Sequence, residues 1–249
     1  MNAPEQKNIP LRRFIPNFVT IFGLCAGLTS VRYGMSGQFS MAMALILLAV
    51  LLDGVDGKLA RMLDSSSQFG AELDTLADFF NFGIAPTILL YLMFFAGTEF
   101  ANIGWLALIM FTIACMMRLA RFNVALLQDD DTPKDSRFFI GVPAPALACL
   151  GLLPAFLYLA GWTGIATHQV LISLYIIGAG ALAVSRIPTF SLKHVSVNPR
   201  HQAWMFGAVV LFMISLTVYP WHVMALVDLI YLASLPMSYK AAKQGIVAE

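Results

Sequence analysis

The chain has 249 residues, of which 59% are hydrophobic and 12% charged, and its mean hydropathy is +0.78. Because soluble domains usually contain about 25% charged residues, this composition indicates an integral membrane protein. The net charge of +1 comes with no basic tract of the kind that binds nucleic acid, so we expect no nucleic-acid partner. Three cysteines are scattered through apolar segments, and their spacing predicts neither a disulfide nor a metal site.

The N-terminal segment changes from polar to both basic and apolar. Residues 1–9 are polar, and residues 10–16 read PLRRFIP. Such a mixture is typical of a short interfacial helix on the membrane surface, and equally of the basic flank of a spanning helix. No small-residue cleavage site follows the first apolar run, so we expect no cleaved signal peptide here.

Eight apolar segments follow, each near the roughly 20 residues that a helix needs to cross a membrane. We expect transmembrane helices at residues 17–33, 38–62, 69–95, 102–126, 143–161, 168–187, 201–219 and 221–239. The prediction is an all-α polytopic membrane protein that forms a single integral membrane domain over residues 1–249. Within it, residues 1–16 would be the interfacial segment, residues 17–187 a catalytic six-helix core, and residues 201–239 two additional helices.

The basic residues indicate how this arrangement is oriented. If the N-terminus lies in the cytoplasm, Arg32 alone among 15 lysines and arginines falls on the opposite side. An excess of basic residues in cytoplasmic loops is the usual rule for membrane proteins. We therefore expect cytoplasmic N- and C-termini.

Two pairs of acidic residues interrupt the apolar sequence between the second and third segments. Asp53 and Asp56 are three residues apart and Asp74 and Asp78 are four apart, so each pair lies on one face of its helix. The polar linker between them would turn the chain, and two antiparallel helices would direct four carboxylates to one place near the cytoplasmic face. Carboxylates at membrane depth usually face a cavity, a partner or an ion. Hard divalent cations with oxygen ligands, Mg²⁺ or Mn²⁺, suit such a group best.

Small and basic residues accompany the acidic pairs. Gly57 and Ala60 lie on or near the first acidic face, and Gly70 lies one turn before Asp74. Small residues let helices approach closely and leave room for a ligand. Arg61 borders the same face, and its planar guanidinium group is well shaped to bind phosphate.

Together these positions read D-x-x-D-G-x-x-A-R-x8-G-x3-D-x3-D, from Asp53 to Asp78. The pattern resembles the signature of the CDP-alcohol phosphotransferase family, whose members transfer a substituted phosphoryl group from a CDP-linked donor to an alcohol and release CMP. The resemblance implies two divalent cations, Mg²⁺ or Mn²⁺, with Asp53, Asp56 and Asp74 as ligands. It implies that Asp78 is the catalytic general base and also a metal ligand.

The same resemblance implies a CDP pocket lined by Asn17, Thr20, Asp53, Asp56, Gly57, Ala60, Arg61, Gly70 and Asp74. The sequence P-N-x-x-T from Pro16 to Thr20 resembles the first-helix motif of the family. Asn17 and Thr20 could bind cytidine or the diphosphate. Alternatively, Asn17 only caps its helix and Thr20 only hydrogen-bonds to the preceding turn.

Four further segments concern the acceptor: ADFFNFGIAPTILLY, MRLARFNV, FFIGVPAPALA and SRIPTFSLK. They resemble the bacterial membrane enzymes of this family that transfer the phosphatidyl group from CDP-diacylglycerol to L-serine. That resemblance, over about residues 12–195, implies a homodimer in the bacterial inner membrane, among membrane lipids. Arg121, Arg118 and Asn81 are the candidate acceptor-binding residues, the arginines for the serine carboxylate and Asn81 for its ammonium group. Both arginines could instead extend to lipid headgroups.

Two other interpretations stay open at this point. Another member of the family could take choline, glycerol phosphate or inositol phosphate, and Phe79, Phe80 and Phe82 would suit an aromatic cage for choline. A phosphorylated acceptor would need a larger basic cluster. An ion or proton transporter would also use buried acids, although transporters often have internal repeats.

Overall fold

The computed structural model describes residues 14–63, 67–127, 138–185, 187–190 and 202–247. Contacts between the elements divide the chain into two compact units, the first ending at Ala85 and the second beginning at Pro86. The expected interfacial helix falls mostly on residues 1–13, outside the described residues, and stays a prediction. The division into a six-helix core and two additional helices also stays a prediction.

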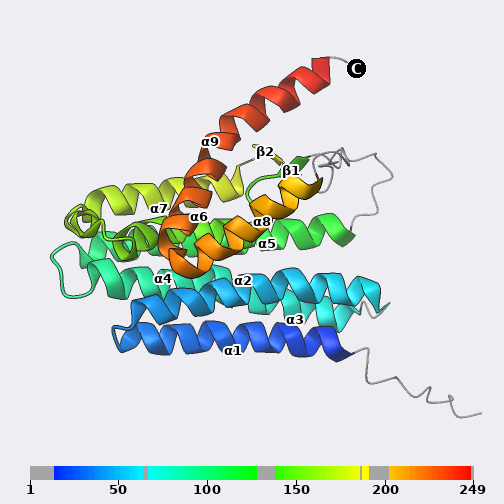
Figure 1. The fold of residues 1–249 in the computed structure, drawn as a ribbon. Coiled ribbons are helices and arrows are strands. Elements are labelled where there is room, and N and C mark those ends of the chain that lie inside the picture. The colour runs from blue at the N-terminus through cyan, green and yellow to red at the C-terminus, as the bar shows by residue number, and fades with distance from the viewer. Residues whose placement is uncertain (1–13, 64–66, 128–137, 186, 191–201, 248–249) are drawn as a thin grey trace, which may run out of the picture. The chain divides into compact units, whose positions relative to one another are not determined.

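The first unit contains helices α1 (Ile15–Met35), α2 (Phe39–Met62) and α3 (Gln68–Asp78), followed by the π-helical turn η2 (Phe79–Ile84). Figure 1 shows α1, α2 and α3 side by side, in blue to cyan. Pro16 lies in the first turn of α1, where its fixed φ angle suits a helix start. Between α1 and α2, Gly37 has a φ of +74°, a left-handed conformation that favours glycine.

Small residues form the buried face of α1. The buried positions recur every three or four residues, at Pro16, Thr20, Gly23, Gly27, Ser30 and Gly34. On α2, the buried residues before the acidic pair are Ala42, Met43, Ile46 and Ala49, of which two are alanines. Small side chains let the two backbones approach closely. Close approach brings polar side chains of α1 within reach of the acidic residues on its neighbours.

The third helix continues beyond α3 without a break. It runs from Gln68 to Phe95 through η2, α4 (Ala85–Leu90) and a second π-helical turn, η3 (Tyr91–Phe95). At its start, the Ser67 hydroxyl accepts a hydrogen bond from the Gly70 backbone N–H over 3.0 Å, which caps the helix. π-Helical turns bond each N–H to the fifth residue back, and they are often found at functional sites.

The long helices described in the second unit are α5 (Ala101–Leu127), α6 (Ala144–Leu159), α7 (Gln169–Val184), α8 (Gln202–Val218) and α9 (Pro220–Val247). The short 3₁₀ helix η4 (Thr163–Thr167) connects α6 to α7. Close packing of α5 on α7 depends on Gly180, because a Cβ atom there would lie 3.3 Å from the Phe111 Cα. The Phe111 ring also occupies the space beside Gly151 of α6.

Two three-residue strands are an addition to the helical prediction. β1 (Phe138–Ile140) and β2 (Pro188–Phe190) pair in antiparallel fashion, with Phe138 opposite Phe190. Segments this short carry no usable period-two pattern, so the sequence does not predict their pairing.

The eight predicted spanning segments correspond to eight apolar helices in the described residues. Five are long and apolar enough to cross a membrane, and three are shorter. Large apolar side chains such as Phe22, Leu51 and Trp204 are exposed on them, as expected for surfaces in contact with lipid. The all-α polytopic fold is therefore confirmed. α9 continues to Val247, beyond the predicted end near residue 239, because the lysine, alanine and glutamine residues at positions 240–244 are good helix formers.

Candidate functional site

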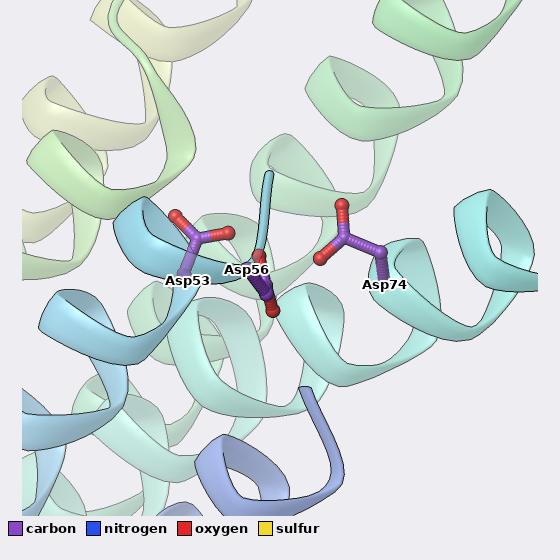
Figure 2. A group of neighbouring side chains, drawn as sticks. All are labelled: Asp53, Asp56 and Asp74. Carbon is purple, nitrogen blue, oxygen red and sulfur yellow. The ribbon is translucent and has the colours of Figure 1, made fainter. Parts of the chain in front are cut away.

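Three aspartate side chains come together from α2 and α3. Asp53 and Asp56 project from α2 and Asp74 from α3, and Figure 2 shows Asp56 between the other two. One carboxylate oxygen of each residue lies within 4.8 Å of those of the other two. Asp56 is buried, with 4% of its surface exposed, and Asp53 and Asp74 are half-buried. We call these three residues the acidic group.

Asp78 adjoins the acidic group. It is the last residue of α3, one turn beyond Asp74 and half-buried. Its side chain lies beside that of Asp53. The spacing of four residues keeps Asp78 on the face of the helix that carries Asp74. Its roles as general base and metal ligand stay predictions.

Thr20 of α1 contacts the buried carboxylate of the acidic group. Its Oγ1 lies 2.7 Å from Asp56 Oδ2 and 3.1 Å from the Pro16 carbonyl oxygen. A hydroxyl has one proton, and a carboxylate is the stronger of these two acceptors. Since Thr20 and Asp56 are both buried, this hydrogen bond fixes the direction in which Asp56 presents its other oxygen.

The acidic group has the chemistry of a divalent cation site. Its carboxylates are hard oxygen ligands of the kind that Mg²⁺ and Mn²⁺ prefer. In addition, Asp74 Oδ1 is buried and has no hydrogen-bond partner among the residues that the structure describes. Burial of a carboxylate oxygen without a partner is unfavourable, and a bound cation would satisfy it. The residues present therefore fit a divalent cation.

A cavity of about 220 Å³ lies beside the acidic group. Its lining includes every residue predicted to bind CDP except Asp53: Asn17, Thr20, Asp56, Gly57, Ala60, Arg61, Gly70 and Asp74. The lining is completed by Pro16, Ser67 and Ala71. The structure thus places motif residues that are up to 57 positions apart, from Asn17 to Asp74, around one hollow.

Gly70 keeps one wall of this cavity open. A Cβ atom at Gly70 would lie 2.9 Å from Asn17 Oδ1 and 3.1 Å from Ser67 Oγ. A larger residue would therefore displace both polar side chains. Ser67 is absent from the predicted site, although a serine just before a helix start is a signal for a capping residue.

The three residues predicted to bind the acceptor have different surroundings. Arg121 of α5 is exposed, and its Nη1 donates a hydrogen bond to the Val184 carbonyl oxygen at the end of α7 over 2.8 Å. Arg118, one turn earlier, is half-buried and lies 6.0 Å from the centre of the Phe122 ring. Asn81 of η2 is 3% exposed. Their acceptor roles stay predictions.

Comparison with known families identifies the chain. The sequence profile of the CDP-alcohol phosphatidyltransferases matches residues 13–185, which is more than half of its length. This protein belongs to the CDP-alcohol phosphatidyltransferase family. A second profile, described as CDP-alcohol phosphatidyltransferase 2, matches residues 205–236. The resemblance inferred from the motif is thereby confirmed.

Relatives within the family come from several bacteria. A protein of Mycobacterium leprae is 36% identical over 241 residues, covering 95% of this chain and 78% of its own. One of Helicobacter pylori is 37% identical over 194 residues, covering 76% of each chain. One of Bacillus subtilis is 32% identical over 194 residues, covering 77% of this chain and 98% of its own. All three are named CDP-diacylglycerol–serine O-phosphatidyltransferase.

The predicted site does not include one buried acidic residue of this protein. Asp228 of α9 is 3% exposed, lies near Cys149 and Tyr175, and its Oδ2 has no hydrogen-bond partner in the described part of the chain. The feature of the sequence that marks Asp228 is its isolation, because it is the only acidic residue in the last two apolar segments. A prediction based on pairs of acids at helical spacing passes over a single one.

Proposed function

We propose that this protein is a phosphatidylserine synthase that transfers the phosphatidyl group from CDP-diacylglycerol to L-serine and releases CMP. The observation that carries the proposal is the acidic group beside a cavity lined by the family motif. Support for serine as the acceptor comes from the names of the relatives, which match this chain over most of its length.

The acidic group is the proposed metal site. Members of the family are generally metal-dependent, and Asp53, Asp56 and Asp74 offer oxygens close enough together to share an ion. Asp78, beside Asp53, is the proposed fourth ligand. We propose two ions of Mg²⁺ or Mn²⁺. When bound, such ions neutralise the diphosphate of the donor and stabilise charge on the leaving phosphate.

The reaction is a displacement at phosphorus. The serine hydroxyl oxygen forms a bond to the phosphorus atom that carries diacylglycerol, and the bond from that phosphorus to the oxygen of CMP breaks. CMP leaves with the electron pair. We propose that Asp78 accepts the proton of the serine hydroxyl as a general base. Holding donor and acceptor in one orientation supplies much of the acceleration, because the bound pair no longer has to meet by diffusion.

The cavity is the proposed site for the CDP part of the donor. Asn17 and Thr20 supply polar groups from α1, and Gly57, Ala60 and Gly70 leave space for the nucleotide. Arg61 lines the same cavity, and its guanidinium group can donate two parallel hydrogen bonds to a phosphate.

The acceptor and the setting follow from the same proposal. Serine carries a carboxylate that must be kept from the aspartates, and Arg121 and Arg118 are the cations proposed to bind it. We place the enzyme in the bacterial inner membrane with cytoplasmic termini and a site near the cytoplasmic face, on the basis of its basic residues. We further propose a homodimer, which native mass measurement in nanodiscs would test; a species of monomer mass alone would refute it.

The decisive experiment is CMP release from CDP-diacylglycerol by the purified protein in detergent, with a panel of acceptor alcohols. We expect turnover with L-serine, loss of turnover after exhaustive chelation, and recovery on adding Mg²⁺ or Mn²⁺. Turnover with choline, glycerol phosphate or inositol phosphate, but not with L-serine, would show that the acceptor is not serine. Activity that survives chelation would refute the metal site.

A further inference from the structure

Asn81 occupies an unusual position next to the acidic residues. It lies within the π-helical turn η2, three residues after Asp78, and only 3% of its surface is exposed. Its Oδ1 is buried without a hydrogen-bond partner among the residues that the structure describes. The burial of an unsatisfied amide oxygen lowers stability. A contribution to folding stability therefore does not explain why an asparagine occupies this position.

The amide of Asn81 fills a notch in α1. A Cβ atom at Gly27 would overlap Asn81 Oδ1 and would lie 3.1 Å from its Cγ. At Gly23, one turn earlier, a Cβ atom would lie 3.6 Å from Asn81 Nδ2, which is ordinary contact. Gly27 is thus the position where α1 has no side chain and the Asn81 side chain takes its place.

This notch lies on the same face of α1 that contacts Asp56 of α2. Gly23 and Gly27 follow Thr20 by one and two helical turns on the buried face of α1. Thr20 binds Asp56 of α2, while Asn81 connects α1 to the helix that carries Asp74 and Asp78. Both acidic helices are therefore set against α1, one through a hydrogen bond and the other through the fit of an amide into a notch.

We propose that Asn81 is a positioning residue for the phosphatidyl transfer, an inference that rests on the proposed function. Its amide, seated at Gly27, fixes how the third helix is rotated and shifted against α1. A π-helical turn would otherwise leave that rotation less determined, because its extra residue shifts the side chains around the axis. The fit keeps Asp74 in the acidic group and Asp78 beside Asp53. On this proposal, Asn81 acts through the aspartates and does not touch the acceptor.

The test is suppression of one substitution by another. Gly27→Ala adds a methyl group where Asn81 Oδ1 lies, and Asn81→Ala removes the amide. We expect Gly27→Ala to lower kcat by at least about tenfold and to weaken binding of Mn²⁺, followed by electron paramagnetic resonance without substrate, by a similar factor. The double variant should recover to the level of Asn81→Ala alone. Gly54→Ala is the matched control, since a Cβ atom there meets nothing within 4 Å.

Further readouts separate positioning from other roles. Asn81→Ala should lower kcat while leaving the KM for serine and the melting temperature in detergent close to those of the wild type. A selective rise in the KM for serine would overturn the proposal, because Asn81 would then bind the acceptor. Wild-type kcat and Mn²⁺ affinity in Gly27→Ala, or a double variant no better than Gly27→Ala, would also overturn it.

The two readouts keep this proposal distinct from the proposed function. If the wild type releases CMP but binds no Mn²⁺, the proposed metal site fails. The role of Asn81 is then decided by whether the double variant recovers the kcat that Gly27→Ala loses. If the wild type binds Mn²⁺ but transfers phosphatidyl to no acceptor, the proposed function fails. The role of Asn81 is then decided by whether the double variant recovers the Mn²⁺ affinity that Gly27→Ala loses.

Discussion

Replacing Thr20 with valine removes a single hydroxyl from the site at nearly constant shape. In the structure this hydroxyl lies 2.7 Å from Asp56 Oδ2, and both residues are buried. A hydrogen bond to a charged group contributes about 1.5–3 kcal/mol. Since 1.4 kcal/mol corresponds to about a factor of ten, Thr20→Val should weaken cation binding about tenfold to a hundredfold. The loss of a group that orients a metal ligand typically has an effect of this size.

The assay measures the cation directly and through turnover. The Mg²⁺ concentration that gives half-maximal CMP release should rise about tenfold or more in Thr20→Val, and Mn²⁺ affinity in the absence of substrate should fall by a similar factor. Thr20→Ser is the control, because serine retains the hydroxyl and should stay close to the wild type in both measurements. Thermal unfolding in detergent should show that the valine variant remains folded.

Two results would contradict this reasoning in different ways. If Thr20→Val keeps wild-type cation affinity and raises the KM for CDP-diacylglycerol, the hydroxyl serves the nucleotide, as the family resemblance implies. If neither constant changes, the hydroxyl donates to the Pro16 carbonyl oxygen in the working enzyme, and Asp56 is oriented without it.

Substitutions at four further positions test the remaining parts of the site. Asp74→Asn should abolish both metal binding and turnover, whereas Asp78→Asn should abolish turnover and retain much of the affinity for CDP-diacylglycerol; equal loss of nucleotide binding in both would remove the separate base role. Gly70→Ala should raise the KM for CDP-diacylglycerol, because its methyl group would lie 2.9 Å from Asn17 Oδ1, and an unchanged donor KM would show that this wall does not contact the nucleotide. Arg121→Ala should raise the KM for serine about tenfold to a hundredfold through loss of a charge-assisted contact, and Arg121→Lys should recover only part because lysine lacks the planar fork. A change confined to the donor KM would instead assign Arg121 to the lipid substrate.

The helices could be predicted from the sequence because their signals are local. A run of about 20 apolar residues is enough to predict a spanning helix, and the eight predicted segments correspond to the eight apolar helices in the part of the chain that the structure describes. The spacing of Asp53 and Asp56 likewise depends only on the geometry of one helix. The convergence of these residues with Asp74 needed one further assumption, that the polar linker reverses the chain.

The partners of single polar residues could not be predicted, because they depend on contacts between helices. For Thr20 the sequence allowed a bond within its own helix or a contact with the nucleotide, and the structure adds Asp56, 36 residues away. Asn81 is similar, since its surroundings depend on a π-helical turn and on two glycines of α1. No pattern of apolar residues specifies a π-helical turn, so the direction of the side chains within it could not be read from the sequence.

The face of α1 explains why these contacts occur together. Carboxylates from α2 and α3 can approach within 4.8 Å only if the helices that carry them are held at a fixed separation and rotation. On α1, Asn17 lies against Gly70 of α3, Thr20 binds Asp56 of α2, and Gly27 receives Asn81. Small residues between these positions allow the close approach that such short side chains need. The first helix carries none of the four aspartates, yet it is the common reference against which both acidic helices are set.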